Sequence, residues 1–313
     1  MDMDMDILKW PFSKKVRKKY REKRHLNFKL IMTLVVRNEE DIVEQNIRFH
    51  CAMGCDGFIV SSHNSTDRTD EILEKLKREG LVLEIIKRTS QNHQHSVWVA
   101  EMIHLAKNKY YADWVINADA DEFYYSSCLD LKKSILQSEG GNVLWVDSIF
   151  IFPEDRKDWL NSSYFVTRPF QKFEADALGI TGNSLYEEFI GSQGCTKVIH
   201  KTHGFVRISD GNHDAKMRFR KKIHSADIRL YHYHIRSYLG WEQKVARWAD
   251  SIFLLPDGQG EHMKHMVRLY QAGKLKDEFE QKYGSQMREY LQKHGVVSND
   301  PSVKNFLRYK GII

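Results

Sequence analysis

The segment from Leu30 to Ser62, "LIMTLVVRNEEDIVEQNIRFHCAMGCDGFIVSS", predicts the beginning of an α/β fold. Both of its ends are short apolar runs of the kind found in buried strands, and Ile42, Phe49 and Met53 between them recur at helical spacing. A strand, a helix and a second strand therefore follow one another closely, as in proteins built around a parallel sheet.

The same alternation continues toward the C-terminus. A helix is expected from near Asp67 to Gly80, then a strand over 81–86 ("LVLEII"), a helix around Val99, and a strand over 113–119 ("DWVINAD"). Four strands separated by three helices predict a doubly wound, mostly parallel sheet flanked by helices. In such sheets ligands bind beyond the carboxyl ends of the strands, which directs attention to the residues that follow each strand.

The second half of the chain predicts a different arrangement. A short helix is expected over Leu131–Gln137 and a long strand over 142–152 ("NVLWVDSIFIF"). From Pro153 to about Tyr231 the sequence is irregular, aromatic and rich in turns, which favours antiparallel strands at the end of the sheet and a loop region facing the substrate. From Gly240 onward apolar residues recur at helical spacing and predict a helical C-terminal region.

We divide the chain on this basis into a basic N-terminal segment (1–28), an α/β domain (29–255) and a helical C-terminal extension (256–313), with Pro256, Asp257 and Gly258 as the linker. A length of 313 residues with 42% hydrophobic residues suits one large domain with additions. Four cysteines are too few for a disulfide framework in a chain this long, so we expect free, buried thiols.

Neither a membrane span nor a secretion signal is predicted. No apolar stretch approaches the ~18 residues of a spanning helix, and the start "MDMDMDILKW" lacks the basic-then-apolar order of a signal, so we expect a cytoplasmic protein. The run from Lys14 to Arg24 ("KKVRKKYREKR") is almost wholly basic and predicts peripheral contact with the inner face of a membrane, with a solvated helix face as the alternative. Without a recognisable RNA-binding signature, no nucleic-acid partner is expected.

Three carboxylates stand at the tip of the fourth predicted strand. The stretch "VINADADEF" (115–123) contains Asp119, Asp121 and Glu122. Carboxylates this close together would repel one another unless a cation lay among them, and Mn²⁺ and Mg²⁺ prefer oxygen ligands. The single residue between Asp119 and Asp121 lets both point to the same side of an extended segment. The pattern favours a Mn²⁺ or Mg²⁺ site, whereas a single Asp here would indicate only a helix cap or a surface charge.

Several motifs in a fixed order resemble those of one enzyme family. R-N-E (37–39) follows the first strand, S-T-D (65–67) follows the second, "NADADEF" (117–123) follows the fourth, and "LYHYHIRSYLGWEQKV" (230–245) comes late. In this order the chain resembles the metal-dependent glycosyltransferases of the GT-A fold, particularly family 2-like members with a D-x-D-E-F motif. The resemblance implies a GT-A-like catalytic domain that moves a sugar from a nucleotide-sugar donor to a hydroxyl of a glycan or glycolipid acceptor, in surface polysaccharide assembly.

The resemblance also implies site residues. The metal ligands would be Asp119, Asp121 and His232. The residues that bind the nucleotide-sugar donor would be Arg37, Asn38, Glu39, Asn64, Asp67, Asp119, Arg236 and Lys244. Arg236 and Lys244 would add positive charge beside the departing diphosphate. His232 and His234 stand two positions apart and would share one face of a strand, with a satisfied histidine pair as the alternative.

The base that takes the proton of the acceptor hydroxyl is expected in the aromatic loop region. Glu187 and Glu188 are the candidates, with Asp176 and Asp214 as alternatives, while Asp121 would be catalytic through the metal. A retaining enzyme would not need the same base, so the stereochemistry stays open.

The sequence before S-T-D departs from the pattern of many relatives. Where they carry an acidic residue, this chain has Ser62, His63 and Asn64. The usual carboxylate contact to a uracil base is therefore in question, and the donor base stays open.

A competing motif, "SDGNHDA" (209–215), favours a different chemistry. G-N-H-D also occurs in dinuclear metallophosphoesterases, and "HYH" (232–234) downstream adds two histidines. That class also needs D-x-H after the first strand and G-D-x-x-D after the second, where this chain has "VVRNEE" and "HNSTDRT". A phosphoesterase is therefore the alternative and a glycosyltransferase is the prediction.

Overall fold

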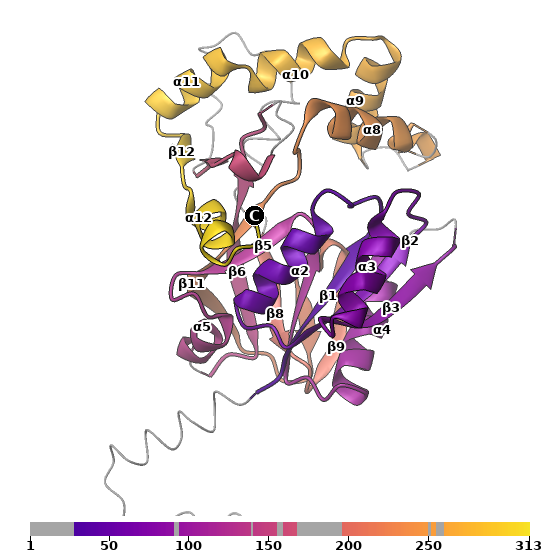
Figure 1. Cartoon of the computed structure of the whole chain (residues 1–313), viewed down its shortest axis with the longest axis vertical. Helices are drawn as coiled ribbons and strands as arrows, with labels where there is room; N and C mark the ends of the chain where they lie inside the picture. The colour runs from indigo at the N-terminus through magenta and orange to yellow at the C-terminus, as the bar shows by residue number, and fades with distance from the viewer. Residues whose placement is uncertain are drawn as a thin grey trace, which may run out of the picture.

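The strand–helix alternation predicted for the first half of the chain is present in the computed structural model. The structure describes residues 28–90, 94–138, 140–154, 159–167, 196–249, 252–254 and 260–313. The first elements are β1 (Leu30–Val36), α2 (Val43–Ala52), β2 (Gly57–His63), α3 (Thr69–Arg78), β3 (Val82–Arg88), α4 (His95–Asn108) and β4 (Trp114–Asp119). β1 pairs in parallel with β2 and with β4, and β2 pairs in parallel with β3. The predicted parallel unit is confirmed (Figure 1).

The rest of the sheet is mixed. Its described elements are β5 (Glu122–Ser126), α5 (Leu131–Gln137), β6 (Val143–Ile151), β7 (Tyr164–Val166), β8 (Thr196–Lys201) and β11 (Lys222–His232). β8 is antiparallel to β4 and β6, and β7 is antiparallel to β6, so the sheet does finish in antiparallel strands. β11 lies antiparallel to β5 and parallel to β6. The predicted α/β class is confirmed, with antiparallel pairing in the second half of the sheet.

Two strands occupy positions that the sequence pattern did not predict. β11 lies in the region expected to be irregular, because its sequence "KIHSADIRLYH" contains no long apolar run. β5 begins at Glu122, the last of the three carboxylates, and only Ala120 and Asp121 separate it from β4. The sequence shows no turn signal between β4 and β5, so its pattern does not separate the two strands. Residues 168–195, which include most of the expected substrate-facing loop, lie outside the described residues.

Helices cover both faces of the sheet. β1 is buried on both faces, which explains its unbroken apolar run. Met32 and Leu34 of β1 belong to the core shared with α2, α3, α5 and α12 (Ser302–Tyr309). Ile31 points to the other face, where α4 packs together with a two-stranded sheet of β9 (Phe205–Ile208) and β10 (Ala215–Met217).

The C-terminal region is helical, as predicted, and lies over the carboxyl ends of the parallel strands (Figure 1). It contains α8 (Tyr238–Trp248), α9 (Glu261–Gln271), α10 (Leu275–Tyr283) and α11 (Ser285–Lys293). A short strand, β12 (Val297–Asn299), then pairs with β7, so this region also adds to the sheet. The boundary at 255 and the linker lie outside the described residues, and the division into domains stays a prediction. None of the helices in the described ranges has both the length and the apolar composition of a membrane span.

Asn46 of α2 fixes the two-residue connection between β4 and β5. Its buried Nδ2 donates to the carbonyl oxygens of Ala120 and Glu122, at 2.9 and 2.8 Å. One turn further along α2, His50 Nε2 accepts the backbone N–H of Tyr124 at 2.9 Å. Burial lowers the pKa of His50 to about 3, so the neutral ring can accept this bond. Helix α2, which packs against β5, therefore holds the carboxylate motif in position.

We expect Asn46→Ala to lower the free energy of unfolding by about 2–4 kcal/mol, because two buried carbonyl groups lose their donor. Chemical denaturation monitored by circular dichroism measures this change. Asn305→Ala, on the exposed side of α12, is the control and should stay within about 0.5 kcal/mol of the parent. Equal effects of the two substitutions would contradict the role given to Asn46.

Candidate active site

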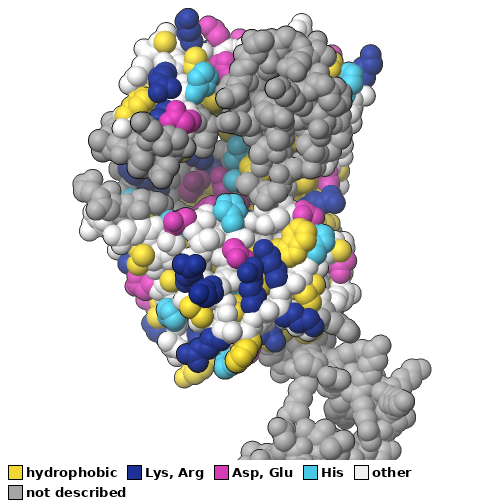
Figure 2. Space-filling view, turned by 180° about the vertical axis from the view of Figure 1, so that it is seen from behind, with side chains coloured by type: hydrophobic (Ala, Val, Ile, Leu, Met, Phe, Trp, Pro, Cys, Tyr) yellow, Lys and Arg dark blue, Asp and Glu magenta, His cyan; other side chains and the backbone are white. Residues whose placement is uncertain are grey.

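The candidate site lies at the edge where β1, β2, β4 and β11 end. The register sets Val35 of β1 beside Asp119 of β4 and beside Ser61 of β2, so the loops after these strands share one edge. His232, the last residue of β11, lies opposite Glu122 of β5. Figure 2 shows acidic and histidine side chains inside a hollow at mid-height of the molecule. The topology therefore gathers the motifs that were far apart in the sequence.

Asp121 and His232 form a buried pair. Oδ1 of Asp121 lies 3.3 Å from Nε2 of His232. The backbone N–H of Tyr233 donates to the carbonyl oxygen of Asp121 at 2.8 Å, so β11 also holds the main chain of this residue. Burial alone would raise the pKa of Asp121, but His232, Lys244 and Arg236 hold it well below its usual range. Burial lowers the pKa of His232, and Asp121 more than reverses that change.

Lys197 of β8 brings an ammonium group to the other two carboxylates. Its Nζ lies 2.8 Å from Oε1 of Glu122 and 3.4 Å from Oδ2 of Asp119, and the side chain is 7% exposed. The N–H of Asp119 donates to Oε2 of Glu122 at 3.1 Å. Burial would raise the pKa of Asp119, but Lys197 and His95 lower it to about 2. The expected repulsion among the carboxylates is therefore relieved by a lysine of the chain itself.

Arg236, between β11 and α8, joins the late motif to the loop after β1. Its Nη2 donates to Oε2 of Glu39 at 2.7 Å, and its Nε donates to Oδ2 of Asp41 at 2.7 Å. Burial raises the pKa of Glu39 to about 7, because the opposing charge of Arg236 only partly offsets it and Asp121 adds to the rise. Two segments expected to bind one donor are thus in direct contact.

The loops after β1 and β2 are tied to each other by the predicted polar residues. Asn38 and Asn64 both adopt left-handed backbone, with φ of 56° and 49°, which Asn tolerates better than most residues. Oδ1 of Asn38 accepts the N–H of Thr66 at 2.7 Å. Asp67 accepts the N–H groups of Glu40 and of Thr69, at 3.1 and 3.0 Å. Asn38 and Asp67 therefore shape the edge, and Asn64 stays exposed beside it.

Besides Lys197, the described residues bring Arg37, Arg236, Lys244 and Arg247 to this edge. Arg37 is exposed at the end of β1, and Lys244 of α8 acts electrostatically on both Asp121 and Glu39. Arg247 lies one turn beyond Lys244, and burial together with the neighbouring Arg37 lowers its pKa. With Arg236 these side chains form a cationic rim that faces the buried carboxylates, an arrangement that suits an anionic ligand.

Of the four acids considered as the catalytic base, the structure describes only Asp214. Glu187, Glu188 and the alternative Asp176 lie outside the described residues. Asp214, the other alternative base, pairs instead with Arg220 and with Lys222. The assignment of a base therefore stays a prediction, and Asp214 is a poor candidate.

The residues present fit a divalent cation in part. Oδ1 of Asp121 is buried and, among the described residues, accepts no well-formed hydrogen bond, while an imidazole nitrogen lies 3.3 Å away. Asp119 instead meets Lys197 and His95, so the described residues contain no group of three His, Cys, Asp or Glu side chains arranged to hold an ion. Mg²⁺ is usually held by one or two carboxylates together with substrate phosphates. Asp121 and His232 fit that pattern, with Asp119 at the rim.

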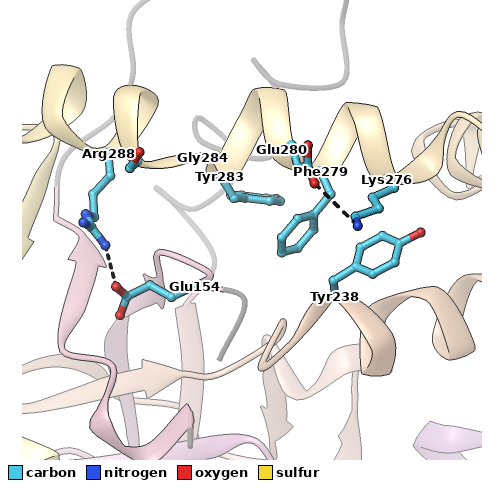
Figure 3. A pocket seen from close by; sticks show the side chains of 9 residues that line it. Glu154, Tyr238, Lys276, Phe279, Glu280, Tyr283, Gly284 and Arg288 are labelled. Carbon is cyan, nitrogen blue, oxygen red and sulfur yellow. Dashed lines mark hydrogen bonds and ion pairs between the residues drawn. The ribbon is translucent and has the colours of Figure 1, made fainter. Parts of the chain in front are cut away.

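A separate cavity of about 370 Å³ lies among the C-terminal helices. The rings of Tyr238, Phe279 and Tyr283 contribute to its lining (Figure 3). Its charged side chains pair with one another, Arg288 with Glu154 and Lys276 with Glu280. Its described lining includes none of the carboxylates of the motif, so the cavity is distinct from the candidate active site.

Sequence reasoning missed four residues that the structure brings to the site. Lys197 and His95 contact Asp119, Asn46 holds the motif, and Arg247 joins the rim. A signal existed for Arg247 alone, because it follows Lys244 by three positions on a predicted helix and so shares its face.

Comparison with known proteins gives a family and a set of distant structures. A model of glycosyltransferase family 92 matches residues 32–283, whereas no curated protein matches significantly. S. aureus TarS is 13% identical, over 80% of this chain and 44% of that one, with a TM-score of 0.39. TarS 1–349 in complex with UDP-GlcNAc is 12% identical, over 80% and 73%, with a TM-score of 0.41. Glucosyl-3-phosphoglycerate synthase from Mycobacterium tuberculosis, in complex with Mg²⁺ and UDP, is 17% identical over 42% and 47%, with a TM-score of 0.31. The chain covers less than half of TarS and of this synthase.

We expect Lys197→Met to destabilise the fold by about 3–5 kcal/mol, because Glu122 is fully buried and would lose its only described cation at ion-pair distance. Urea denaturation measures the change. Lys197→Arg should keep most of the stability, and Lys197→Met combined with Glu122→Gln should recover much of the loss. Independent, additive effects of the two substitutions would rule out the pairing.

Glu39 should make stability depend on pH. Its pKa is about 7 in the folded chain and about 4.5 when unfolded, so its stabilising contribution is complete below about pH 4.5 and is lost as the pH rises through 7. We expect the difference in unfolding free energy between the parent and Glu39→Gln to change across this window by about 3 kcal/mol. Glu71→Gln, at an exposed position of α3, is the control, and its unfolding free energy should vary with pH in the same way as that of the parent. A pH-independent difference for Glu39→Gln would refute the assignment.

Proposed function

Because the chain belongs to glycosyltransferase family 92, we propose that it moves a sugar from a nucleotide-sugar donor to a hydroxyl of a glycan or glycolipid acceptor, with the help of Mn²⁺ or Mg²⁺. The motifs resembled family 2-like enzymes, and that resemblance holds at the coarser level of a glycosyltransferase. The mixed α/β sheet agrees with the GT-A-like fold that the motifs implied.

The observation that carries the proposal is the pairing of buried acids with a cationic rim at the ligand edge of the sheet. Asp121 and His232 lie 3.3 Å apart, and the field of Arg236 and Lys244 reaches Asp121. A nucleotide-sugar donor carries a diphosphate, which meets cations at the rim and a carboxylate-bound ion beneath it. Both halves of the site therefore complement one ligand.

Asp121 and His232 would hold the metal ion, with Asp119 beside them and donor phosphates completing the shell. A bound Mn²⁺ or Mg²⁺ supplies positive charge that stabilises a diphosphate leaving group. Among the described residues, Lys197 keeps Asp119 and Glu122 charge-balanced, and Asn46 keeps the motif at the strand tip. These contacts pre-order the site before the donor arrives.

Arg236 and Lys244 would bind the diphosphate, and Arg37 and Arg247 would extend the positive field toward the nucleotide. Arg236 is engaged by Glu39 and Asp41 in the structure, so it is held in place by carboxylates until phosphate oxygens compete for it. Asn38, Asn64 and Asp67 would shape the pocket for the nucleoside. Glu187 or Glu188 would take the proton of the acceptor hydroxyl.

We also propose a role in surface polysaccharide assembly at the cytoplasmic face of the membrane, on the strength of the motifs and the basic run Lys14–Arg24. The phosphoesterase alternative is not favoured. A dinuclear site needs several converging ligands, whereas Nδ1 of His213 faces the carbonyl oxygen of Thr196 and Asp214 pairs with Arg220.

We expect Asp121→Asn to remove at least about 100-fold of the transfer activity while the chain stays folded, because the buried site loses the charge that holds the ion. Transfer from a radiolabelled sugar nucleotide measures activity, and circular dichroism checks the fold. Asp277→Asn, an exposed acid on α10, is the control and should transfer normally. A fully active Asp121→Asn variant would contradict the proposal that Asp121 holds an ion needed for transfer.

A thermal-shift and calorimetric screen should identify the donor. UDP-, GDP-, CMP- and ADP-sugars are each added with Mn²⁺, without it, and with chelator. We expect one nucleotide to raise the melting temperature only in the presence of metal, and Asp121→Asn to lose that shift. Stabilisation by metal and phosphate alone, with no response to any nucleotide, would favour the phosphoesterase instead.

A further inference from the structure

We propose that the amino edge of the sheet, opposite the candidate active site, is a docking surface for an anionic lipid bilayer. The amino-edge surface consists of Tyr111, Lys201, Arg218, Phe219, Arg220 and Lys221. It belongs to folded parts of the chain and takes no part in the donor site. The inference stands apart from the proposed transferase activity and would hold for any activity at the opposite edge.

The surface is strongly basic. Between Lys201 and Lys222 the sequence has seven Lys and Arg residues and two Asp residues. Lys201 and the run from Arg218 to Lys222 are all exposed. Of the two acids, Asp214 already pairs with Arg220 and Lys222. Exposed Asp113 also lies at this edge, where its carboxylate accepts the N–H of Lys29, and Arg218, Lys201 and Lys221 leave the surface net positive. Figure 2 shows Lys and Arg side chains gathered on the lower half of the side of the molecule that it draws.

An apolar ring projects from the centre of this charge. Phe219 is 87% exposed, the highest value among the large hydrophobic side chains of the described residues. Its loop is firmly held, because Nδ2 of Asn142 donates to the carbonyl oxygen of Phe219 and Oδ1 of Asn142 accepts the N–H of Lys221 at 2.7 Å. The N–H of Arg218 donates to the carbonyl oxygen of Gly204 at 2.8 Å. A structured loop thus presents a phenylalanine to solvent between cations.

Hydrogen bonds connect this loop to the rest of the amino edge. Thr202, beside Lys201, donates its N–H to the carbonyl oxygen of Asp113 at 2.9 Å. Two residues before Asp113 stands Tyr111, which is 79% exposed and adopts left-handed backbone with φ of 55°. A second aromatic ring is therefore held out at the same edge, at a position where the backbone conformation is unfavourable for tyrosine.

The described chain also begins at this edge. The N–H of Asp113 donates to the carbonyl oxygen of Lys29 at 2.9 Å, so the start of β1 adjoins the amino-edge surface. The basic run from Lys14 to Arg24 precedes Phe28 by only a few residues in the sequence. The basic run therefore comes shortly before the first described residue of this edge in the sequence.

This chemistry fits a bilayer better than a nucleic acid. Lys and Arg are attracted to anionic headgroups, while an exposed phenylalanine gains by entering the boundary of the acyl chains. A duplex backbone would use the same cations but would offer no apolar layer for Phe219. The combination of a projecting ring and flanking cations selects the lipid surface.

Docking by the amino edge limits which acceptors can reach the candidate site. This step rests on the proposed function. β11 runs from Lys222 at the amino edge, beside Val143 of β6, to His232 at the active edge, beside Phe150. Because β11 bulges between His224 and Arg229, the distance follows the eight residues of β6 and is roughly 25 Å. A chain docked by the amino edge would hold its candidate site at about that height above the bilayer. Its acceptor would be the distal end of an extended glycan rather than a sugar at the lipid headgroup.

Co-sedimentation of the full chain with vesicles tests the docking surface. We expect binding to vesicles of phosphatidylcholine with 30% phosphatidylglycerol, at least fivefold weaker binding to pure phosphatidylcholine, and loss of binding in high salt. Phe219→Ser and the pair Arg218→Glu with Lys221→Glu should each weaken binding at least fivefold. Tyr309→Ser is the matched control, because Tyr309 is 77% exposed, stands between Arg308 and Lys310, and lies on α12 away from this edge.

The outcomes separate docking from catalysis. The Phe219 and Arg218–Lys221 variants should keep the metal-dependent thermal shift with nucleotide sugar, because these substitutions leave the candidate active site at the opposite edge unchanged. Equal vesicle binding by the parent and Phe219→Ser would overturn the proposal, as would salt-sensitive binding to duplex RNA that ignores Phe219 and exceeds binding to the vesicles. Loss of nucleotide response with intact vesicle binding would count against the proposed function alone.

Discussion

The buried ion pair between Lys197 and Glu122 is the contact on which the candidate site depends. Glu122 begins β5 with its side chain fully buried, and Lys197 reaches it from β8 at 2.8 Å. A buried carboxylate without a partner would take up a proton or distort the strand. With the pair formed, the chain can pass from β4 to β5 through only Ala120 and Asp121, and the second aspartate of the motif is left to meet His232.

The contacts of Lys197 reduce the number of carboxylates that need an external cation. Three neighbouring acids suggest that an external cation balances all of them, yet two are balanced within the chain. The requirement for a divalent ion then narrows to Asp121 and His232, because the partner of Asp121 is an imidazole that can itself be a metal ligand, whereas the other two acids share an ammonium group. A site that is mostly charge-balanced before binding can stay folded without its ligand and still offer one strong position to a phosphate-bound ion.

The two edges of the sheet differ in which charged side chains they bury and expose. The carboxyl edge buries acids beneath a rim of cations, whereas the six residues of the amino-edge surface are exposed cations and aromatic rings. The parallel strands create this separation, because every strand of the unit begins at one edge and ends at the other. A fold of this kind keeps a surface for attachment and a site for chemistry apart on opposite ends of the same strands.

The sequence by itself determined the parallel unit, because β1, β2 and β4 are buried on both faces and their apolar runs need no partner to be recognised. It also determined which loops carry the polar motifs, since these follow directly from the ends of the strands. It did not determine β11, whose charges interrupt the apolar pattern, nor the role of Lys197, which resembles any surface lysine. Only the tertiary structure decided that Lys197 meets Glu122 and that Arg236 meets Glu39, because those contacts join segments whose spacing in the sequence carries no local signal.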